Sequence, residues 1–417
     1  MNSTAELADK TVVSTKESHD AGLDHRVTVC TSWDEMERLR PQWDEILRAN
    51  PALTIFSTFE WLQSWWRAFG AGKELVSLIC SDYSGNIVAI VPLYRERVYW
   101  KLGLYITRLR LVGDGSGDSD NLDLIVFPGH ECAVARMFER WLRTAAVDIC
   151  ELNTMHSESA AAQAVLDELS TSRWKLSNYD QPWSAVILPE TWQGYVAQLS
   201  SKERLKVGNR LRRLQARYTV EFRKCTSRTE LPSQLQTLFA LHQKRWEARG
   251  KPGSFRSEER KNFYSLMSEQ FLRQRWLELW TLLLNGEPVA AQFGFRYGST
   301  VFSLQEGFDP EHSADSVGYV LRSYVLQQLI NSGIRRYEFL AGADESKLRW
   351  GGETGHYLNI HVAAPRTWGS LHLQAARTIW KAKTKVRTLY PGLTGSCLAW
   401  LERIGWSRAN AASKSDR

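Results

Sequence analysis

The sequence predicts an α+β protein made of two similar lobes, each a mixed, mainly antiparallel sheet flanked by helices, with a helical extension at the C-terminus. Two observations predict the lobes. Helical and strand-like patterns follow one another in nearly the same order in residues 26–190 and again in residues 191–365. Each stretch also contains a hairpin signal, at residues 84–86 and at Asn285-Gly286. We therefore expect a duplicated fold whose lobes face each other across a cleft.

The elements of the first lobe follow from its apolar spacing. Apolar residues such as Trp43 and Ile46 recur at helical intervals, and a second helix begins at Ser57 or Thr58 and ends at Gly70. The expected order is a strand at 26–30, helices at 34–50 and 56–70, strands at 74–82, 86–98, 108–115 and 121–127, a helix at 134–146, a strand at 147–153 and a helix at 160–172.

The second lobe repeats this plan with a clearer signal. A three-stranded meander turns at Asn285-Gly286, and a later amphipathic helix begins at a Ser316 cap and ends at Gly333. The expected order is helices at 201–218, 233–250 and 258–274, strands at 277–284, 287–297 and 300–308, a helix at 316–333, and strands at 335–342 and 356–364.

Composition excludes several classes of protein. Hydrophobic residues make up 43% and charged residues 24% of the 417 residues, which excludes a wholly disordered chain. No apolar run approaches the ~18–20 residues of a membrane span, and the N-terminus lacks a signal-peptide pattern. The six cysteines form no CxxC pair, and no Cys/His set has the spacing of a metal site. We expect a cytoplasmic protein without a bound metal, with residues 1–25 as a disordered tail.

The C-terminal extension, residues 366–417, is strongly basic. Residues 366–408 hold eight Lys or Arg and one acid, Glu402, and apolar residues from Leu371 to Leu389 recur at helical spacing. One interpretation is a helix that contacts the inner membrane surface, another polyanion or a synthase complex. The other, which the alanine-rich stripe favours, is a helix that caps the second lobe.

Three segments of the second lobe carry residues suited to group transfer. The helix start at residues 316–319 has unpaired amides and the positive end of a helix dipole, which suit a phosphate. Glu338 is the one acid in an apolar strand, where it either pairs with Arg335 or Arg336 or has a raised pKa and acts as a general base. Lys347 either lies in a solvated loop or neutralises a phosphate or an oxyanion.

The order of these segments resembles the GNAT acyltransferase fold, and more closely the CelD/BcsL-type acetyltransferases, a double-GNAT group related to the FemABX aminoacyl transferases. The resembling stretches follow the family's order. They are SDNLDLIVFPG, SSKERLKVGNRLRRLQ, LHQKRWEARG, EGFDPEHSADSVGYVL and RRYEFLAGADESKLRWGG.

The resemblance assigns roles to residues of this sequence. It implies catalytic roles for Glu338, at the acidic position of the family's Asp-Phe-Leu-x-Gly, and for Lys347, within its Tyr-Lys-x-x-Trp signature. Ser346 replaces the tyrosine of that signature, and Asn121 replaces the tyrosine of the Ser-Asp-Tyr-x-Asp loop. The further positions are Gln305, Gly307, Ser316, Val317, Gly318 and Tyr319 for the donor, and Asp120, Asp123, His242, Arg245, Trp246 and Trp350 for the substrate.

The resemblance implies an acyltransferase that uses acetyl-CoA or a longer acyl-CoA. Its acceptor would be an amine or hydroxyl of a small molecule or saccharide in exopolysaccharide or cell-envelope biosynthesis. Two alternatives stay open. A FemABX-like transferase would use aminoacyl-tRNA, with the basic residues 202–224 as its RNA contact, although we favour a solvated helix face for that segment. A non-catalytic subunit of a polysaccharide synthase would keep only the fold. No feature indicates binding to DNA.

Overall fold

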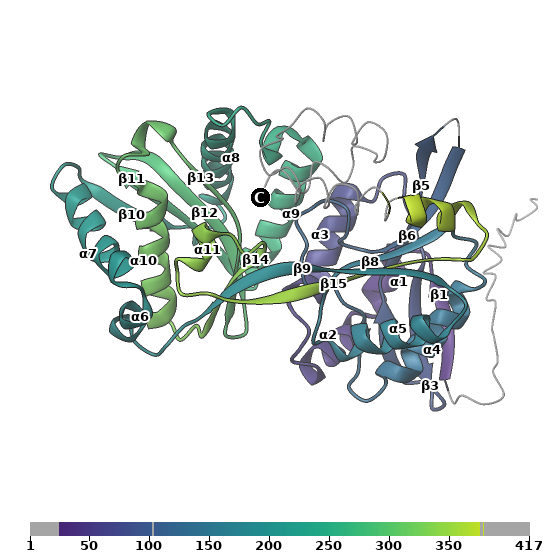
Figure 1. The fold of residues 1–417 in the computed structure, drawn as a ribbon. Coiled ribbons are helices and arrows are strands. Elements are labelled where there is room, and N and C mark those ends of the chain that lie inside the picture. The colour runs from purple at the N-terminus through teal and green to yellow at the C-terminus, as the bar shows by residue number, and fades with distance from the viewer. Residues whose placement is uncertain (1–24, 102–103, 376–377, 379–417) are drawn as a thin grey trace, which may run out of the picture.

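The computed structural model describes residues 25–101, 104–375 and 378 (Figure 1). The expected tail and most of the basic extension lie outside these residues. The first half of the chain forms β1 (His25–Cys30), α1 (Trp33–Arg38), α2 (Arg40–Ala49), η1 (Ile55–Ser57), α3 (Phe59–Phe69), β2 (Glu74–Leu75), β3 (Ser77–Asp82), β4 (Ile87–Val91), β5 (Leu93–Lys101), β6 (Leu104–Leu111), β7 (Ile125–Val126), α4 (Glu131–Leu142), β8 (Ile149–His156), α5 (Ala160–Thr171) and β9 (Lys175–Ile187).

The second half supplies the remaining elements. They are α6 (Trp192–Gln198), α7 (Ser201–Gln215), β10 (Val220–Lys224), α8 (Leu231–Glu247), η2 (Ser254–Arg256), α9 (Glu258–Arg273), β11 (Leu277–Leu284), β12 (Glu287–Tyr297), β13 (Thr300–Phe308), η3 (Pro310–His312), α10 (Val317–Asn331), β14 (Arg336–Ala341), α11 (Glu345–Leu348) and β15 (Glu353–Ala363).

Several predicted elements differ from those in the structure. The expected helix at 34–50 is two helices that meet at Leu39, because Pro41 starts a new helix rather than continuing the old one. Helix α7 ends at Gln215, so Arg223 and Lys224 belong to strand β10 and not to a long basic helix. The sequence patterns did not predict β9, β10, α6 or α11. β9 was missed because polar residues alternate along it and Pro182 interrupts the pattern.

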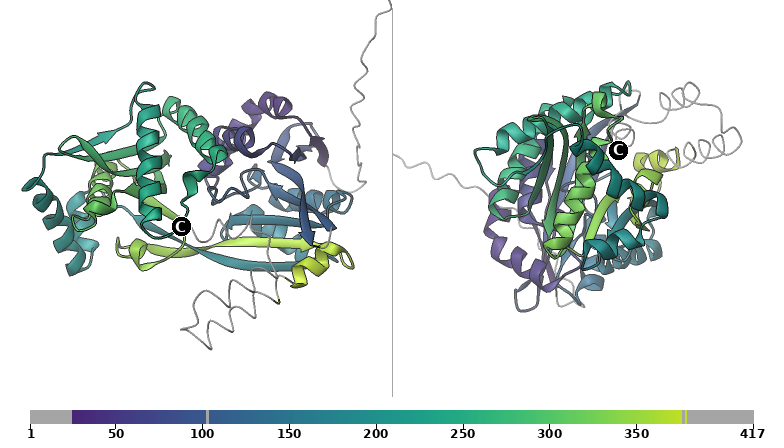
Figure 2. Two further views of the ribbon diagram at one scale, coloured as in Figure 1. Left: turned by 90° about the horizontal axis from the view of Figure 1, so that it is seen from above. Right: turned by 90° about the vertical axis from the view of Figure 1, so that its left-hand side faces the viewer.

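Two sheets organise the fold. A four-stranded sheet has the order β1-β3-β4-β7, and an eleven-stranded sheet has the order β10-β11-β12-β13-β14-β9-β15-β8-β6-β5-β2. Helices α3, α8 and α9 lie on one face of the larger sheet, and α4, α5, α6 and α10 lie on the other (Figures 1 and 2). The predicted α+β class and the two tandem lobes, each a mixed sheet flanked by helices, are confirmed.

The two lobes exchange strands. β9, from the first half of the chain, pairs antiparallel with β14 of the second lobe, and β15, from the second half, pairs antiparallel with β8 of the first. β9 and β15 also pair with each other, from Ala185 opposite Glu353 to Lys175 opposite Ala363. The long ribbons of both strands run from one lobe into the other in Figure 1. The backbone hydrogen bonds of each lobe therefore require a strand from the other half of the chain.

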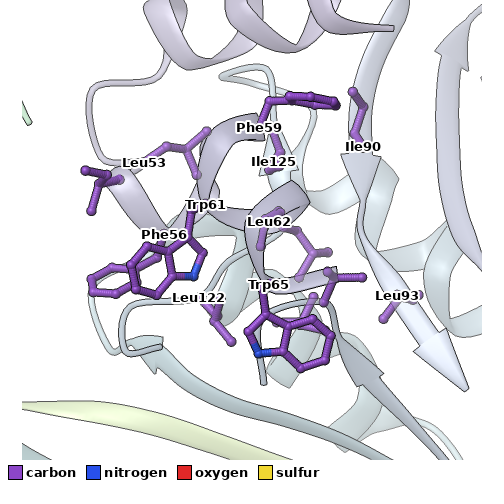
Figure 3. Close-up of a cluster of buried hydrophobic side chains, with 14 of the residues drawn as sticks. Leu53, Phe56, Phe59, Trp61, Leu62, Trp65, Ile90, Leu93, Leu122 and Ile125 are labelled. Carbon is purple, nitrogen blue, oxygen red and sulfur yellow. The ribbon is translucent and has the colours of Figure 1, made fainter. Parts of the chain in front are cut away.

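A shared aromatic core lies where the lobes meet. The Phe56 ring lies edge-on to Phe302, with 5.5 Å between ring centroids, and Trp61 contacts Phe263 of α9 at 5.2 Å. Figure 3 shows Phe56, Trp61 and Trp65 among aliphatic side chains of the first lobe. Much of the tryptophan surplus is therefore core packing. Over the described ranges, no helix has both the length and the apolar character needed to cross a membrane.

The exchange predicts that both lobes unfold together. At Gly355 of β15, an added Cβ would lie 2.1 Å from the Trp183 ring of β9. We expect Gly355→Ala to lower the free energy of unfolding by about 1–3 kcal/mol through overpacking. Denaturation followed by tryptophan fluorescence and by far-UV circular dichroism should give coincident transitions.

The matched control is Gly208→Ala on the exposed face of α7, where an added Cβ meets only the end of the Arg212 side chain, at 3.7 Å. It should leave stability unchanged or raise it by up to about 1 kcal/mol through helix propensity. Two separate transitions, or equal stability of the two variants, would contradict the shared unfolding.

Candidate active site

The central feature of the site is the early end of the pairing between β13 and β14. The two strands pair in parallel only from Thr300 opposite Arg336 to Phe302 opposite Glu338, although both continue further. Past this point, residues 303–306 of β13 are partly exposed, whereas Val301 and Phe302 are buried. Among the residues that the structure describes, the edge of β13 that faces β14 therefore has no strand partner there. We call this region, between residues 303–308 and 339–342, the gap.

A bulge shapes the β14 side of the gap. The register against β9 shifts between Glu338 and Ala341, and Leu340 has a left-handed φ of 61°. Lys347 donates from Nζ to the carbonyls of Phe339 (2.9 Å) and Ala341 (2.5 Å). These hydrogen bonds hold the irregular strand in place. The structure thus places Lys347 at the gap as a residue that positions the backbone.

Glu338 lies at the last paired position and is 5% exposed. Its Oε1 accepts from Arg336 Nε at 2.5 Å, whereas Oε2 is buried and accepts no hydrogen bond from the described residues. Burial raises the pKa of Glu338, Arg336 opposes this, and the negative charge of Asp120 adds to the increase. The Arg336 partner that the sequence offered is therefore present, and the pKa of Glu338 is raised despite it.

Asp120 brings the first lobe to this site. Its carboxylate accepts from the backbone N–H of Ala341, at the bulge of β14, at 2.9 Å. Asp123, three residues later, turns away into the first lobe and accepts from the N–H of Leu124 at 2.8 Å. Burial raises the pKa of Asp123 to about 7, against a hydrogen bond from Ser159. Of these two predicted residues, the structure brings only Asp120 to the gap.

An ion cluster occupies the β13 side of the gap. Glu306 accepts from Arg245 of α8 at 2.9 Å and pairs with Arg322 of α10. Burial alone would raise the pKa of Glu306, but the charges of Arg322 and Arg245 outweigh it and lower the pKa to about 2. Because α8 and α10 cover opposite faces of the sheet, their arginines meet only where the strands have separated.

Helix α8 approaches β13 closely enough to place its functional side chains there. A Cβ added at Gly307 of β13 would lie 2.3 Å from the backbone nitrogen of His242 in α8. The helix can therefore approach the strand this closely only because residue 307 is glycine. Trp246 donates from Nε1 to His242 Nε2 at 2.9 Å, and the Gln305 side chain lies beside His242. Burial and the charge of Arg245 lower the pKa of His242 to about 3. This histidine is therefore neutral at physiological pH.

The start of α10 differs in detail from the expected phosphate-binding turn. Ser316 precedes the helix as predicted, but it has a left-handed φ of 57° and its side chain does not cap the helix. Val317 is buried and Gly318 is partly exposed. Tyr319 stacks on Trp350, with 4.4 Å between ring centroids. These two aromatic side chains form part of the packing under α10, and Trp350 is only 2% exposed.

The sequence analysis missed the importance of two arginines and one glutamate. Arg322 interrupts the apolar sequence of α10, and that single charge in an apolar helix was the available signal. Arg336 was noted only as a partner of Glu338, although it also pairs with Glu353 at 2.5 Å. Glu306 lies between Gln305 and Gly307, the two positions of this strand to which the resemblance gave a role. A carboxylate that meets charges from both faces of a sheet has no signature in local sequence.

The first lobe has an equivalent strand pair, and it is closed. β6 and β8 pair in parallel from Arg108 opposite Ile149 to Arg110 opposite Glu151. Beyond this point the loop that follows β6 bridges the two strands. Asp114 of this loop accepts a hydrogen bond from the Asn153 side chain of β8 at 2.8 Å. Arg110 also pairs with Glu151, and both side chains are about 5% exposed or less. The two lobes thus share a plan, but in the first lobe a hydrogen bond from Asn153 to Asp114 joins the separated strands.

The paired arginines predict a specific dependence of stability on pH. The folded pKa of Glu306, about 2, lies below its ordinary value of 4.5, so the carboxylate stabilises the fold above that value and less as pH falls toward 2. The difference in unfolding free energy between wild type and Glu306→Gln should stay constant above about pH 5 and shrink toward pH 2. Urea denaturation at several pH values measures it.

The control for this prediction is Glu311→Gln, which removes an exposed carboxylate three residues beyond β13. Its stability should follow that of wild type at every pH. A difference for Glu306→Gln that does not change with pH would contradict the assignment of the ion cluster.

Comparisons with known proteins agree with this geometry. Residues 201–348 match the family model described as an acetyltransferase (GNAT) domain. No curated protein matches the sequence. Within the described residues, no group of His, Cys, Asp or Glu side chains is arranged to hold a metal ion.

The fold is similar to that of several solved structures. A crystal structure of FemX matches with a TM-score of 0.54 and 11% identity, over 77% of this chain and 95% of that one. A conserved protein of unknown function from Bacteroides thetaiotaomicron matches with a TM-score of 0.50 and 14% identity, over 78% of this chain and 97% of that one. Residues 201–348, which contain α8, α10 and both strands of the gap, are therefore similar to a GNAT acetyltransferase domain, and they lie within the two tandem lobes described above.

Proposed function

We propose that this protein is an acyltransferase of the CelD/BcsL type that transfers an acetyl or longer acyl group from acyl-CoA. The acceptor is an amine or a hydroxyl group, and the resemblance of the sequence suggests a role in polysaccharide or cell-envelope biosynthesis. One observation carries the proposal. The GNAT domain match spans the place where β13 and β14 stop pairing, and there the fold exposes strand-edge amides next to a buried carboxylate.

The reaction is a direct transfer. The acceptor attacks the thioester carbonyl, the carbon–sulfur bond breaks, and CoA leaves as its thiol after taking up a proton. Glu338 acts as the base that removes the acceptor's proton; a raised pKa and a carboxylate oxygen without a hydrogen bond support this role. Backbone N–H groups around Gln305 and Gly307, past the point where β13 stops pairing with β14, stabilise the oxyanion. Lys347 keeps β14 in the shape that this requires.

The donor's diphosphate binds at the start of α10, beside Val317 and Gly318. The first amides of a helix have no intrahelical acceptor, and the Ser316 side chain leaves them uncapped. Asp315 lies close by, but Arg217 pairs with it at 2.5 Å and offsets its charge. The bridged strands of the first lobe support a single donor site in the second.

The donor proposal predicts stabilisation by thioesters. In a thermal-shift experiment on the full chain, acetyl-CoA or a longer acyl-CoA should raise the melting temperature. A ligand at about 100 times its Kd adds about 2.7 kcal/mol of apparent stability. Free CoA should give a smaller or equal shift, and adenosine should give none. The absence of a shift with any thioester would exclude acyl-CoA as the donor.

The catalytic proposal predicts different effects for the two carboxylates that share Arg336. Glu338→Gln removes the base and should lower kcat by about 10²–10⁴-fold with little change in thioester binding. Glu353→Gln is the matched control, because Glu353 pairs with the same guanidinium but its side chain is 48% exposed. Release of CoA, followed with a thiol reagent, measures both. Equal activity of the two variants would contradict a catalytic role for Glu338.

A transferase that uses aminoacyl-tRNA is the second candidate. One observation favours it: α7 exposes four cations, Lys202, Arg204, Arg212 and Arg213, on the outside of the lobe that contains the gap. An RNA contact there should weaken steeply as salt rises, because bound phosphates release counterions. Binding of tRNA that falls by orders of magnitude between low and moderate salt, without any thioester shift, would favour this candidate.

A further inference from the structure

Positive charge exceeds negative charge around Glu306, on the β13 side of the gap. Arg245 and Arg322 both pair with the single carboxylate of Glu306, whose pKa also responds to the charge of Lys347. Arg249 adds a fourth cation, since burial and the charge of Arg245 lower its pKa. Asp344, near Lys347, is the other acid of this group. Four cations thus lie around the carboxylate of Glu306 in a half-buried setting, where unbalanced charge is costly, whereas Asp120, Glu338 and Arg336 lie on the β14 side of the gap.

The two arginines also keep unused donors. Each guanidinium contacts the Glu306 carboxylate through one terminal nitrogen, at 2.9 Å for Arg245, and not through the two parallel bonds of a fork. The Nε atoms of Arg245 and Arg322 are buried and have no hydrogen-bond partner among the described residues. The Arg322 side chain is 13% exposed and that of Arg245 is 16% exposed. Buried donors without acceptors indicate that a further acceptor group belongs here.

Packing holds both arginines in place for such a group. The Arg245 guanidinium lies over the Phe308 ring at 5.1 Å, and Arg322 lies over Phe339 at 5.2 Å. Phe308 ends β13 and Phe339 belongs to β14, so each strand supports one guanidinium at the gap. Glu306 keeps the two cations together while its own side chain stays 32% exposed. The arrangement is preorganised for an oxygen anion that bridges both arginines.

We propose that the gap binds an oxyanion of the acceptor, a carboxylate or a phosphoryl group, through Arg245 and Arg322. The assignment to the acceptor rests on the proposed function. In that proposal the donor's diphosphate binds at the start of α10 and its thioester arm is uncharged, so the donor brings no anion into the gap. The protein therefore acylates an anionic acceptor, and Arg245 and Arg322 are residues that bind it.

The first experiment measures anion binding by the full chain. Thermal shifts are recorded with inorganic phosphate and with succinate, each against sodium chloride at the same ionic strength. Saturable stabilisation by at least one of the two anions is expected. The anion that stabilises the protein more shows whether the acceptor's group is a phosphoryl group or a carboxylate. Shifts equal to those with chloride for both anions would overturn the proposal.

Variants locate the bound anion. Arg245→Gln and Arg322→Gln should each weaken the anion's affinity by about tenfold or more, the loss expected for one charge-assisted hydrogen bond. Lys244→Gln is the matched control, because it removes the same charge one residue away on α8. Lys244 is 58% exposed and pairs with Asp309 at 2.8 Å. The affinity of Lys244→Gln for the anion should stay within about twofold of that of wild type. Equal losses in Lys244→Gln and Arg245→Gln would overturn a specific site.

Titration with CoA separates this proposal from the donor proposal. If the anion belongs to the acceptor, Arg245→Gln and Arg322→Gln keep the CoA affinity of wild type. Loss of CoA affinity in both variants would assign the cluster to the donor and overturn the acceptor assignment. If the anion binds but no thioester does, the anion site formed by Arg245 and Arg322 stands, and only the proposal of a CoA donor is wrong. Circular dichroism of each variant checks that it is folded.

Discussion

The early end of the ladder between β13 and β14 is the constraint on which the rest of the site depends. A continuous ladder would satisfy every edge amide of β13 and would keep the helices on the two faces of the sheet apart. Because pairing stops after Phe302 and Glu338, three things become possible together. The edge of β13 is left without β14 beside it, Glu306 meets arginines from both faces, and the β14 bulge accepts hydrogen bonds from Lys347 and donates one to Asp120.

The same constraint explains why the two lobes differ in spite of a common plan. Both contain a short parallel pairing between a meander strand and the strand that follows a helix. In the first lobe, Asp114 and Asn153 close the separated strands, and the buried Arg110–Glu151 pair fills the space beside them. Charge is then balanced inside that lobe. In the second lobe the single carboxylate of Glu306 pairs with two arginines, which suits the anionic ligand proposed above.

Local sequence signals predicted much of the fold. The meander over 277–308 and the helix ending near Gly333 have strong turn and cap residues, and the structure reproduces them. The exchanged strand β9 was not predictable in this way. Its polar alternation reflects pairing with β14 and β15, which lie far away in sequence, and local propensity contains no information about those partners. The prediction of one helix over 34–50 was wrong for a simpler reason, because Pro41 lies at the start of a second helix.

For the candidate site, motif positions located the region but not the arrangement. Glu338, Lys347, Asp120, His242, Arg245, Gln305 and Gly307 all lie at or beside the gap. Tyr319 and Trp350 pack together under α10, and Asp123 turns away. The missing part was Arg322 with Glu306, a contact between side chains from two elements. Such contacts depend on how far strands separate, and that distance is a property of the assembled sheet.

The strand exchange has a consequence for how such a protein can change over evolutionary time. A gene that lost either half would leave the surviving half with one of its sheet edges uncovered, since β9 completes the second lobe and β15 completes the first. Neither copy of the duplicated unit can be deleted, swapped for a homologue or recombined by itself. The halves must be inherited as a pair, because each supplies a strand that the sheet of the other requires.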